Sequence, residues 1–304
     1  MPVLIGFDGS ERSAAAIAVA GRLLAPREAL VCHSWRGVSR AILHTNPAAL
    51  PGVLGQAAED LDEADLAAAA ETASAGADLA REAGFTAESL PVREERKTWR
   101  TLLQVAQERE AACIVVGAQG RSGLERVLLG SVSNAVVNHS RVPVLVVPGT
   151  GGEGPALLCW DGSEPAENAI ARAGELLAAP AATVLGCWES WTAEAPALAG
   201  ASKAVMSMAT ELDEVAGERS AEEVGRGVEL ARAAGFAATP LSARTSGPLW
   251  KTILDTADAE DASAVVLGSR GLSGLSAALG SVSHGVAHHS PRPVLIIPPE
   301  GGAQ

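Results

Sequence analysis

The chain has 304 residues, of which 47% are hydrophobic and 19% are charged, and its formal net charge is −13 at pH 7. This length is enough for one large domain or for two domains of ordinary size, each with its own core. The acidic balance disfavours nucleic acid and anionic membrane surfaces as partners, because such contacts need clustered Lys and Arg.

The first half of the sequence alternates short apolar runs with helical patterns. We expect strands at residues 3–7, 29–34, 86–92, 113–116 and 142–147. We expect helices after Ser10, a candidate N-cap, and at residues 58–83, 98–109 and 131–139, with Gly84 as a C-terminal stop. Strands separated by helices pair in parallel, which predicts an open α/β sheet covered on both faces. Ligands of such sheets bind beyond the carboxyl ends of the strands, where Asp8 and Gly117 are placed.

The same pattern is present twice in the chain. Residues 3–17 resemble residues 157–170, residues 79–85 recur as 230–236, and residues 142–148 recur as 292–298. Because the order of the matches is kept, the sequence indicates two copies of one domain. We place the domains at residues 1–149 and 155–304, with the glycine-rich stretch between them as the linker.

The titratable residues outside the expected strand ends suggest no separate site. The cysteines show no C-x-x-C spacing and lie in or beside apolar runs, so we interpret them as buried free thiols in a reducing compartment: Cys32, Cys113, Cys159 and Cys187. Positions 284 and 288 stand one helical turn apart, but we expect solvated or capping roles rather than metal ligation for His284, His288 and His289. The acidic run at 59–65 and the mixed run at 93–97 are expected to be exposed faces.

No apolar run approaches the ~20 residues that a membrane helix requires. The first residues have no cationic start and no long apolar stretch, so they do not resemble a signal peptide. These two observations lead us to expect a cytoplasmic protein without a membrane partner.

A glycine-rich passage at residues 117–131 follows the fourth expected strand of the first half. Glycine in structured segments costs roughly 0.5 to 1 kcal/mol relative to alanine, so the cluster suggests an unusual backbone shape or a close approach. A helix that begins at Gly130 and Ser131 can hold phosphate on its N–H groups. Ser131 and Ser133 are expected to supply hydroxyl donors, Ser131 also to cap the helix, and Arg121 to supply a cation. The spacing is neither Walker A nor the dinucleotide fingerprint, so a plain strand-to-helix connector stays open as the alternative.

The spacing of Gly117, Gly120 and Gly130-Ser131 resembles the ATP-binding motif of the universal stress protein family. The similarity extends to residues 6–10, 113–117 and 143–148 and covers almost all of both halves. The resemblance implies an α/β fold of two tandem Rossmann-like domains, of the adenine nucleotide alpha hydrolase-like type. Each would be an open five-stranded parallel sheet with helices on both faces. It also implies ATP as the ligand, with or without Mg²⁺, and pairing through the last strands as an intrachain pseudo-dimer, with a homodimer left open.

The family pattern implies a nucleotide site in the first half. Gly6 and Asp8 are expected near the nucleoside, the backbone around Ser34 near adenine, and the glycine passage around the ribose and phosphates. For Asp8 the alternative is an Asp-Gly-Ser turn that only starts a helix. The implied residues are Gly6, Asp8, Ser34, Gly117, Gly120, Arg121, Ser122, Gly123, Gly130, Ser131, Val132 and Ser133.

The second half departs from this pattern. Only eight residues separate Gly271 from Gly280, against nine in the first half, and Cys159 occupies the place of Gly6. Each helical residue turns the chain by ~100°, so the loss of one residue predicts a displaced or weakened second site. Its implied residues are Asp161, Gly268, Arg270, Gly271, Gly274, Gly280, Ser281, Val282 and Ser283.

From these observations we expect an ATP-binding regulator or sensor of the stress response, with no catalytic residue and no metal site. Phosphoryl transfer needs a cation or metal beside the phosphates and a residue that positions the nucleophile. The glycine passage contains no lysine, and no general base is evident. Two alternatives stay open: a slow ATPase or phosphoryl-accepting protein, and an interaction module without nucleotide. Residues 36–56 are expected to form a mobile cover.

Overall fold

The structure is a computed structural model. It describes residues 1–25, 27–37, 53–120, 127–149, 151–178, 180–192, 203–245, 247–269 and 279–299. The expected cover at residues 36–56 lies mostly outside the described residues.

The elements of the first half follow the order that the sequence predicts. They are β1 (Val3–Gly6), α1 (Glu11–Leu23), β2 (Glu28–Trp35), α3 (Val53–Glu82), β3 (Thr86–Arg93), α4 (Thr98–Glu108), β4 (Cys113–Gly117), β5 (Gln119–Gly120), β6 (Val127–Leu128), α5 (Ser131–His139) and β7 (Val144–Val147). Most boundaries lie within two residues of the expected ones. Two features differ: α3 begins at Val53 rather than residue 58, and the glycine passage contains a short antiparallel pair, β5 and β6.

The second half repeats the arrangement. Its elements are β8 (Ala156–Trp160), α6 (Glu164–Leu176), β9 (Ala181–Glu189), α7 (Lys203–Ala233), β10 (Ala237–Thr245), α8 (Leu249–Ala259), β11 (Val265–Gly268), α9 (Ser281–His289) and β12 (Val294–Ile297). Local signals mark the same boundaries in both halves. Ser10 and Ser163 cap α1 and α6 by accepting hydrogen bonds from the backbone N–H groups of Ser13 and Ala166. Gly84 and Gly235 follow α3 and α7 with positive φ angles of 93° and 97°, a conformation that glycine adopts freely.

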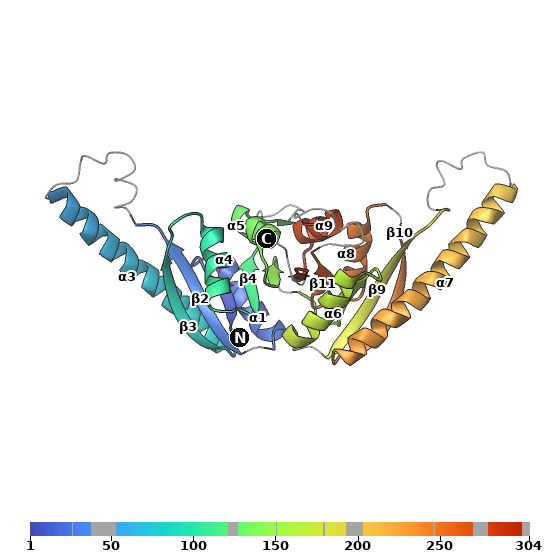
Figure 1. Cartoon of the computed structure of the whole chain (residues 1–304), viewed down its shortest axis with the longest axis horizontal. Coiled ribbons are helices and arrows are strands. Elements are labelled where there is room, and N and C mark those ends of the chain that lie inside the picture. Colours follow the sequence, from blue (N-terminus) through green and yellow to red (C-terminus); the bar gives the residue numbers. More distant parts are fainter. Residues whose placement is uncertain are drawn as a thin grey trace.

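In the described part of the chain, the ten longer strands belong to one mixed sheet. Within the halves the strands run parallel, in the orders β7-β4-β1-β2-β3 and β12-β11-β8-β9-β10. The halves join where β7 and β12 pair antiparallel, with Leu145 opposite Leu295. Figure 1 shows the result: the halves lie side by side, and the long helices α3 and α7 are at opposite ends. The predicted tandem α/β domains, each with a five-stranded parallel sheet and helices on both faces, are confirmed.

A hydrophobic core lies on each face of the sheet. On one face α1, α3, α6 and α7 pack over residues such as Ile5 and Leu158, which are fully buried. On the other face α4, α5, α8 and α9 pack over Ile114 and Val265. Both clusters contain residues from both halves, so the β7–β12 junction is continuous with the core. Burial of this apolar surface is the main stabilising contribution to the fold.

The glycine-rich linker is closely packed against the second half. The N–H groups of Gly152 and Gly154 donate to the carbonyl oxygens of Ala262 and Asp261, at 3.1 and 2.9 Å. A Cβ atom at Gly152 would lie 1.9 Å from the Asp261 carbonyl oxygen. This distance is too short for any residue with a side chain to fit. The glycines therefore permit a close backbone approach in addition to connecting the domains.

One histidine of α9, His288, contacts the first half of the chain. The rings of His284 and His288 stack with centroids 4.1 Å apart, and His288 Nε2 lies 3.1 Å from Asn134 Oδ1 of α5. His288 lies in the last turn of α9, as a capping role requires, and its ring is half-buried at this junction rather than fully solvated. Within the described ranges, no group of three or more His, Cys, Asp or Glu residues is placed to hold a metal ion.

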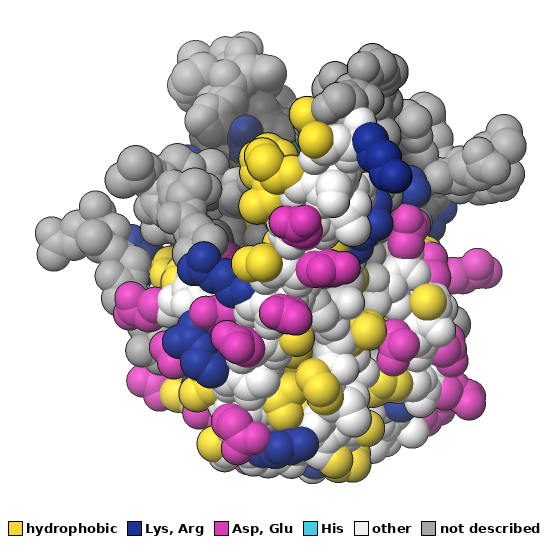
Figure 2. Space-filling model, turned by 90° about the vertical axis from the view of Figure 1, so that its right-hand side faces the viewer, with side chains coloured by type: hydrophobic (Ala, Val, Ile, Leu, Met, Phe, Trp, Pro, Cys, Tyr) yellow, Lys and Arg dark blue, Asp and Glu magenta, His cyan; other side chains and the backbone are white. Residues whose placement is uncertain are grey.

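The outer ends of α3 and α7 extend past the sheet (Figure 1). Figure 2 faces the α7 end of the molecule, where hydrophobic and acidic side chains are interspersed. The large hydrophobic residues exposed on α7 are Val205, Met206, Met208, Leu212 and Val215. In the part of the chain that the structure describes, no helix combines the length and the apolar character needed to cross a membrane.

Candidate functional site

A cavity of about 430 Å³ lies at the carboxyl ends of the first-half strands. Its walls come from the ends of β4, β1, β2 and β3, the first turn of α1, and the N-terminal turns of α4 and α5. The cavity brings together many of the residues implied for the first site: Gly6, Asp8, Ser34, Gly117, Gly130, Ser131, Val132 and Ser133. Gly120 belongs to β5, whereas Arg121, Ser122 and Gly123 lie outside the described residues.

Asp8 forms the turn that starts α1 and also lines the cavity. Its Oδ1 atom accepts hydrogen bonds from the backbone N–H of Ser10 at 3.0 Å and from the hydroxyl of Ser13 at 2.8 Å. Partial burial acts to raise the pKa of Asp8, but these hydrogen bonds outweigh it and leave the pKa below its ordinary value. Asp8 is therefore a fixed negative charge at the rim, and its structural role does not remove it from the site.

The N-terminus of α5 faces the same cavity. Gly130 occupies the N-cap position and supplies no side-chain cap, so the expectation that Ser131 caps this helix is wrong. The first N–H groups of a helix have no intrahelical acceptor, and the dipole places partial positive charge there. Residues 131–133 thus present donors to the cavity that suit an anion.

The hydroxyl of Ser133 is already used by the protein. It donates to the carbonyl oxygen of Gly117 at 2.7 Å and so holds α5 against the end of β4. The side chain of Ser133 is buried. Its expected role as a hydroxyl donor to phosphate is therefore replaced by a positioning role, and its contribution to the cavity is the backbone.

Sequence reasoning missed a buried carboxylate at the other end of the cavity. Glu94, directly after β3, accepts hydrogen bonds from the Ser34 hydroxyl at 2.8 Å, the Thr98 hydroxyl at 2.5 Å and Arg36 Nε at 2.6 Å. The side chain of Glu94 is 4% exposed, so the expectation that the run at 93–97 is an exposed face is wrong at this position. Burial acts to raise the pKa of Glu94, but hydrogen bonds from Arg36, Thr98 and Ser34 bring it below its ordinary value.

Two further lining residues add charge and shape. Arg12 lies in the first turn of α1 and is the positively charged side chain among the described residues that line the cavity. Its carbonyl oxygen is 3.4 Å from the Cβ position of Gly117, which places Arg12 beside the end of β4. His33 lines the cavity from β2, with Nδ1 2.8 Å from the carbonyl oxygen of Phe7.

The second half keeps part of this arrangement. Asp161 Oδ1 accepts hydrogen bonds from the N–H and hydroxyl groups of Ser163, at 3.0 and 2.5 Å. Ser283 donates to the carbonyl oxygen of Gly268 at 2.8 Å, as Ser133 does to Gly117. Gly280 precedes α9 without a side-chain cap, so Ser281 and Val282 begin a helix like α5. Arg270, Gly271 and Gly274 lie outside the described residues.

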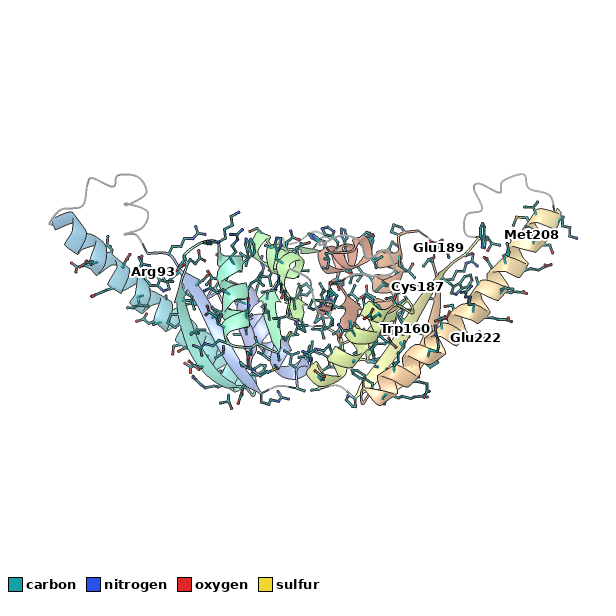
Figure 3. The ribbon with its side chains drawn as sticks, viewed as in Figure 1. Arg93, Trp160, Cys187, Glu189, Met208 and Glu222 are labelled. Atoms are coloured by element: carbon teal, nitrogen blue, oxygen red, sulfur yellow. The ribbon has the colours of Figure 1, made fainter. Side chains whose placement is uncertain are left out.

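At the described positions of the second half that match the network around Glu94, its residues are replaced. Strand registers match Ser34 with Cys187 and Arg36 with Glu189, and both of these residues are labelled in Figure 3. They also match Glu94 with Thr245, whose hydroxyl donates to the carbonyl oxygen of Trp188 at 2.9 Å. Leu249 stands in place of Thr98 and Pro165 in place of Arg12. Burial raises the pKa of Cys187 to about 11, which keeps this thiol neutral.

Comparison with known proteins agrees with this division into two similar halves. The model of the universal stress protein family matches residues 1–148 and 154–298. A universal stress protein of Bacillus subtilis is 31% identical over 150 residues, which cover 48% of this chain and 97% of that protein. One of Mycobacterium tuberculosis is 35% identical over 150 residues, 48% of this chain, and the match spans only 44% of its length.

A solved structure has the same fold along the whole chain. The universal stress protein from Archaeoglobus fulgidus covers 98% of this chain and 98% of its own, with a TM-score of 0.62 and 20% identity.

Proposed function

Because this chain belongs to the universal stress protein family, with a match in each half, we propose that it binds ATP in the first-half cavity and acts as a stress-response regulator or sensor. The observation that supports this most is the cavity itself, with uncapped helix N–H groups at one end and a polar wall at the other. Its volume of about 430 Å³ falls within the range of roughly 300 to 1,000 Å³ typical of small-molecule sites.

The order of the strands suggests how the nucleotide lies. The cavity crosses β4, β1, β2 and β3, and neighbouring strands are about 4.8 Å apart, so it extends for roughly 14 Å. The phosphates fit at the N-terminus of α5, beside Arg12. The ribose then lies over Gly6 and Gly117, and the base reaches the end of β2 near Ser34. Mg²⁺ enters this proposal only as the counterion that accompanies ATP.

Calorimetric titration of the intact chain with ATP tests this proposal. We expect saturable binding at the first-half cavity and weaker or no binding in the second half. Gly6→Cys is a suitable variant because a Cβ at this position has ordinary contact with Leu102, 3.5 Å away, and the second half carries Cys159 there. We expect this variant to fold and to bind ATP roughly tenfold more weakly, a change of about 1.4 kcal/mol. Absence of any binding by the wild type would refute the proposal.

We further propose that the protein is a binder rather than an efficient enzyme. Both described carboxylates of the cavity, Asp8 and Glu94, are held by hydrogen bonds from the protein, and Glu94 lies after β3, away from α5. Glu94 therefore lies too far from the proposed phosphate position to orient a nucleophile there, and the Oδ1 atom of Asp8 is used by the turn that starts α1. We expect phosphate release far below the rates of about 1 s⁻¹ or more that enzymes usually reach. If the wild type instead releases phosphate at such an enzymatic rate, and Gly120→Ala abolishes that release, the ATPase alternative is favoured.

The junction between the halves suggests how binding is reported. We propose that β7 and β12 make the chain an intrachain pseudo-dimer, so that a change in the first cavity reaches the second half through the shared sheet. Ser133 ties α5 to the end of β4, which neighbours β7. A ligand on the N-terminus of α5 therefore acts two strands away from β12.

A further inference from the structure

We propose that Glu94 reads the base of the nucleotide, by accepting a hydrogen bond from an exocyclic amino group. The first site would then prefer a 6-aminopurine over a 6-oxopurine. This inference rests on the proposed function, because it concerns the same cavity, and it adds the chemical basis of base selection.

The position of Glu94 within the cavity supports this role. The anion-binding end lies at α5 and β4, and Glu94 lies at the opposite end, after β3. A nucleotide with its phosphates on α5 therefore directs its base toward Ser34 and Glu94. The carboxylate is buried and also lines the cavity, so a base in that position contacts it with little competing water.

The hydrogen bonds of the carboxylate leave room for one more donor. An ionised carboxylate offers about four acceptor positions. Among the described residues, Oε1 accepts from the Ser34 and Thr98 hydroxyls, whereas Oε2 accepts from Arg36 Nε alone. One acceptor position on Oε2 remains in these contacts. An amino group of a base satisfies it, whereas a carbonyl oxygen would place two acceptors against each other.

The ionisation state strengthens the discrimination. Hydrogen bonds from Arg36, Thr98 and Ser34 overcome the effect of burial and lower the pKa of Glu94, so the group stays a pure acceptor at neutral pH. A ligand that leaves a buried acceptor unpaired, or that places a second acceptor against it, binds much more weakly. A hydrogen bond to a charged group corresponds to a preference of about 10- to 100-fold.

The second half offers a natural comparison. All the members of the network are replaced there: Cys187 for Ser34, Glu189 for Arg36, Thr245 for Glu94 and Leu249 for Thr98. At these four matched positions the carboxylate and its three donors are replaced together, which fits residues that act jointly rather than separate stabilising contacts. Any nucleotide bound in the second half should therefore show no such preference.

The test compares ATP with inosine triphosphate, which carries an oxo group in place of the 6-amino group. Titration of the intact chain should show ATP binding at least tenfold more tightly. In Glu94→Gln the side-chain amide both donates and accepts, so we expect the two affinities to come within about threefold of each other. The matched control is Glu95→Gln, because Glu95 is the exposed neighbour that lines a different cavity, and it should keep the wild-type ratio.

The outcomes separate this inference from the proposed function. If neither nucleotide binds the wild type, the proposed function fails. If both bind with equal affinity, the function stands and base reading by Glu94 is refuted. If Glu94→Gln weakens the binding of both nucleotides equally and keeps the ratio of their affinities, Glu94 only supports the cavity wall. The inference is then again refuted. The wild-type ratio needs no variant, so equal affinities refute the inference even if Glu94→Gln does not fold.

Discussion

At the residue scale, charge is distributed unevenly along the cavity. Arg12 lies near the end of β4, where we place the phosphates, and Glu94 lies after β3, where we place the base. A triphosphate and an adenine ring have opposite requirements, since one needs donors and cations and the other needs an acceptor for its amino group. The positions of Arg12 and Glu94 therefore support a single orientation of the ligand.

Arg12→Ala should weaken the binding of ATP more than the binding of adenosine. The guanidinium is solvent-exposed, so we expect a loss of about tenfold for ATP and little change for adenosine, with the loss shrinking at high salt. Titration with both ligands measures the effect. Arg109→Ala is the matched control because Arg109 lines a cavity beside Pro2 and Glu28, near the starts of β1 and β2. Equal losses for ATP and adenosine would show that Arg12 does not act through the phosphates.

Some of the site was predictable from local sequence and some was not. The turn formed by Asp8, Gly9 and Ser10 depends only on neighbouring residues. Its hydrogen bonds and its place at the strand end therefore follow from the local sequence. Glu94 lies in a charged run whose pattern indicates solvent. Its burial depends on Ser34, which is 60 residues away in the chain. Only the folded sheet brings these residues together, so no local pattern could have shown the network.

At the element scale, helix starts were predicted where a cap or a buried face marks them. The N-cap Ser10 fixes the start of α1, and the start of α5 agrees with the sequence. The start of α3 was placed too late. Among the residues of α3 whose burial is described, the first buried one is Ala69, so the turns from residue 59 to residue 68 have no fully buried face to mark them. The β5–β6 pair is two residues per strand, too short for any alternating pattern.

The linker provides a stability test at this scale. Gly152→Ala places a Cβ atom 1.9 Å from the Asp261 carbonyl oxygen, so we expect it to destabilise the fold by about 1 to 3 kcal/mol, as overpacking does. Gly225→Ala is the matched control: its Cβ has nothing within 4 Å, and it lies inside α7. There alanine should stabilise by up to about 1 kcal/mol. Urea unfolding measures both, and a neutral Gly152→Ala would contradict the close packing of the linker.

At the scale of the whole molecule, the internal repeat predicts two similar halves, but it does not predict how they meet. Repetition shows that each half has the same elements, whereas the β7–β12 pairing depends on which edges are exposed when both have folded. That pairing was suggested only by the family resemblance. The contact between His288 and Asn134 was not predicted, because residues 284 and 288 show only their own helical spacing.

The junction should weaken in acid. Burial and the nearby charges of His284 and His289 lower the pKa of His288, so the folded protein resists protonation while the unfolded chain takes up a proton below about pH 6.5. Stability is therefore present above that pH and is lost as the pH falls. We expect the melting temperature to drop more between pH 7.5 and 5.5 in the wild type than in His288→Asn, which carries the first-half counterpart residue, Asn138.

Thermal unfolding followed by circular dichroism at the two pH values measures this difference. His139→Asn is the control, because His139 stacks on Trp99 of the first half and not on the His284–His288 pair. It should keep the wild-type pH dependence. An equal drop in the wild type and His288→Asn would show that the junction does not respond to His288.

The most direct test of the account is an experimental structure of the intact chain determined with ATP. We predict a nucleotide in the first-half cavity, with its phosphates at the backbone of residues 130–133 and its base beside Ser34 and Glu94. A first-half cavity that stays empty at saturating ATP, or a nucleotide with its base at α5 and its phosphates at β3, would contradict the account.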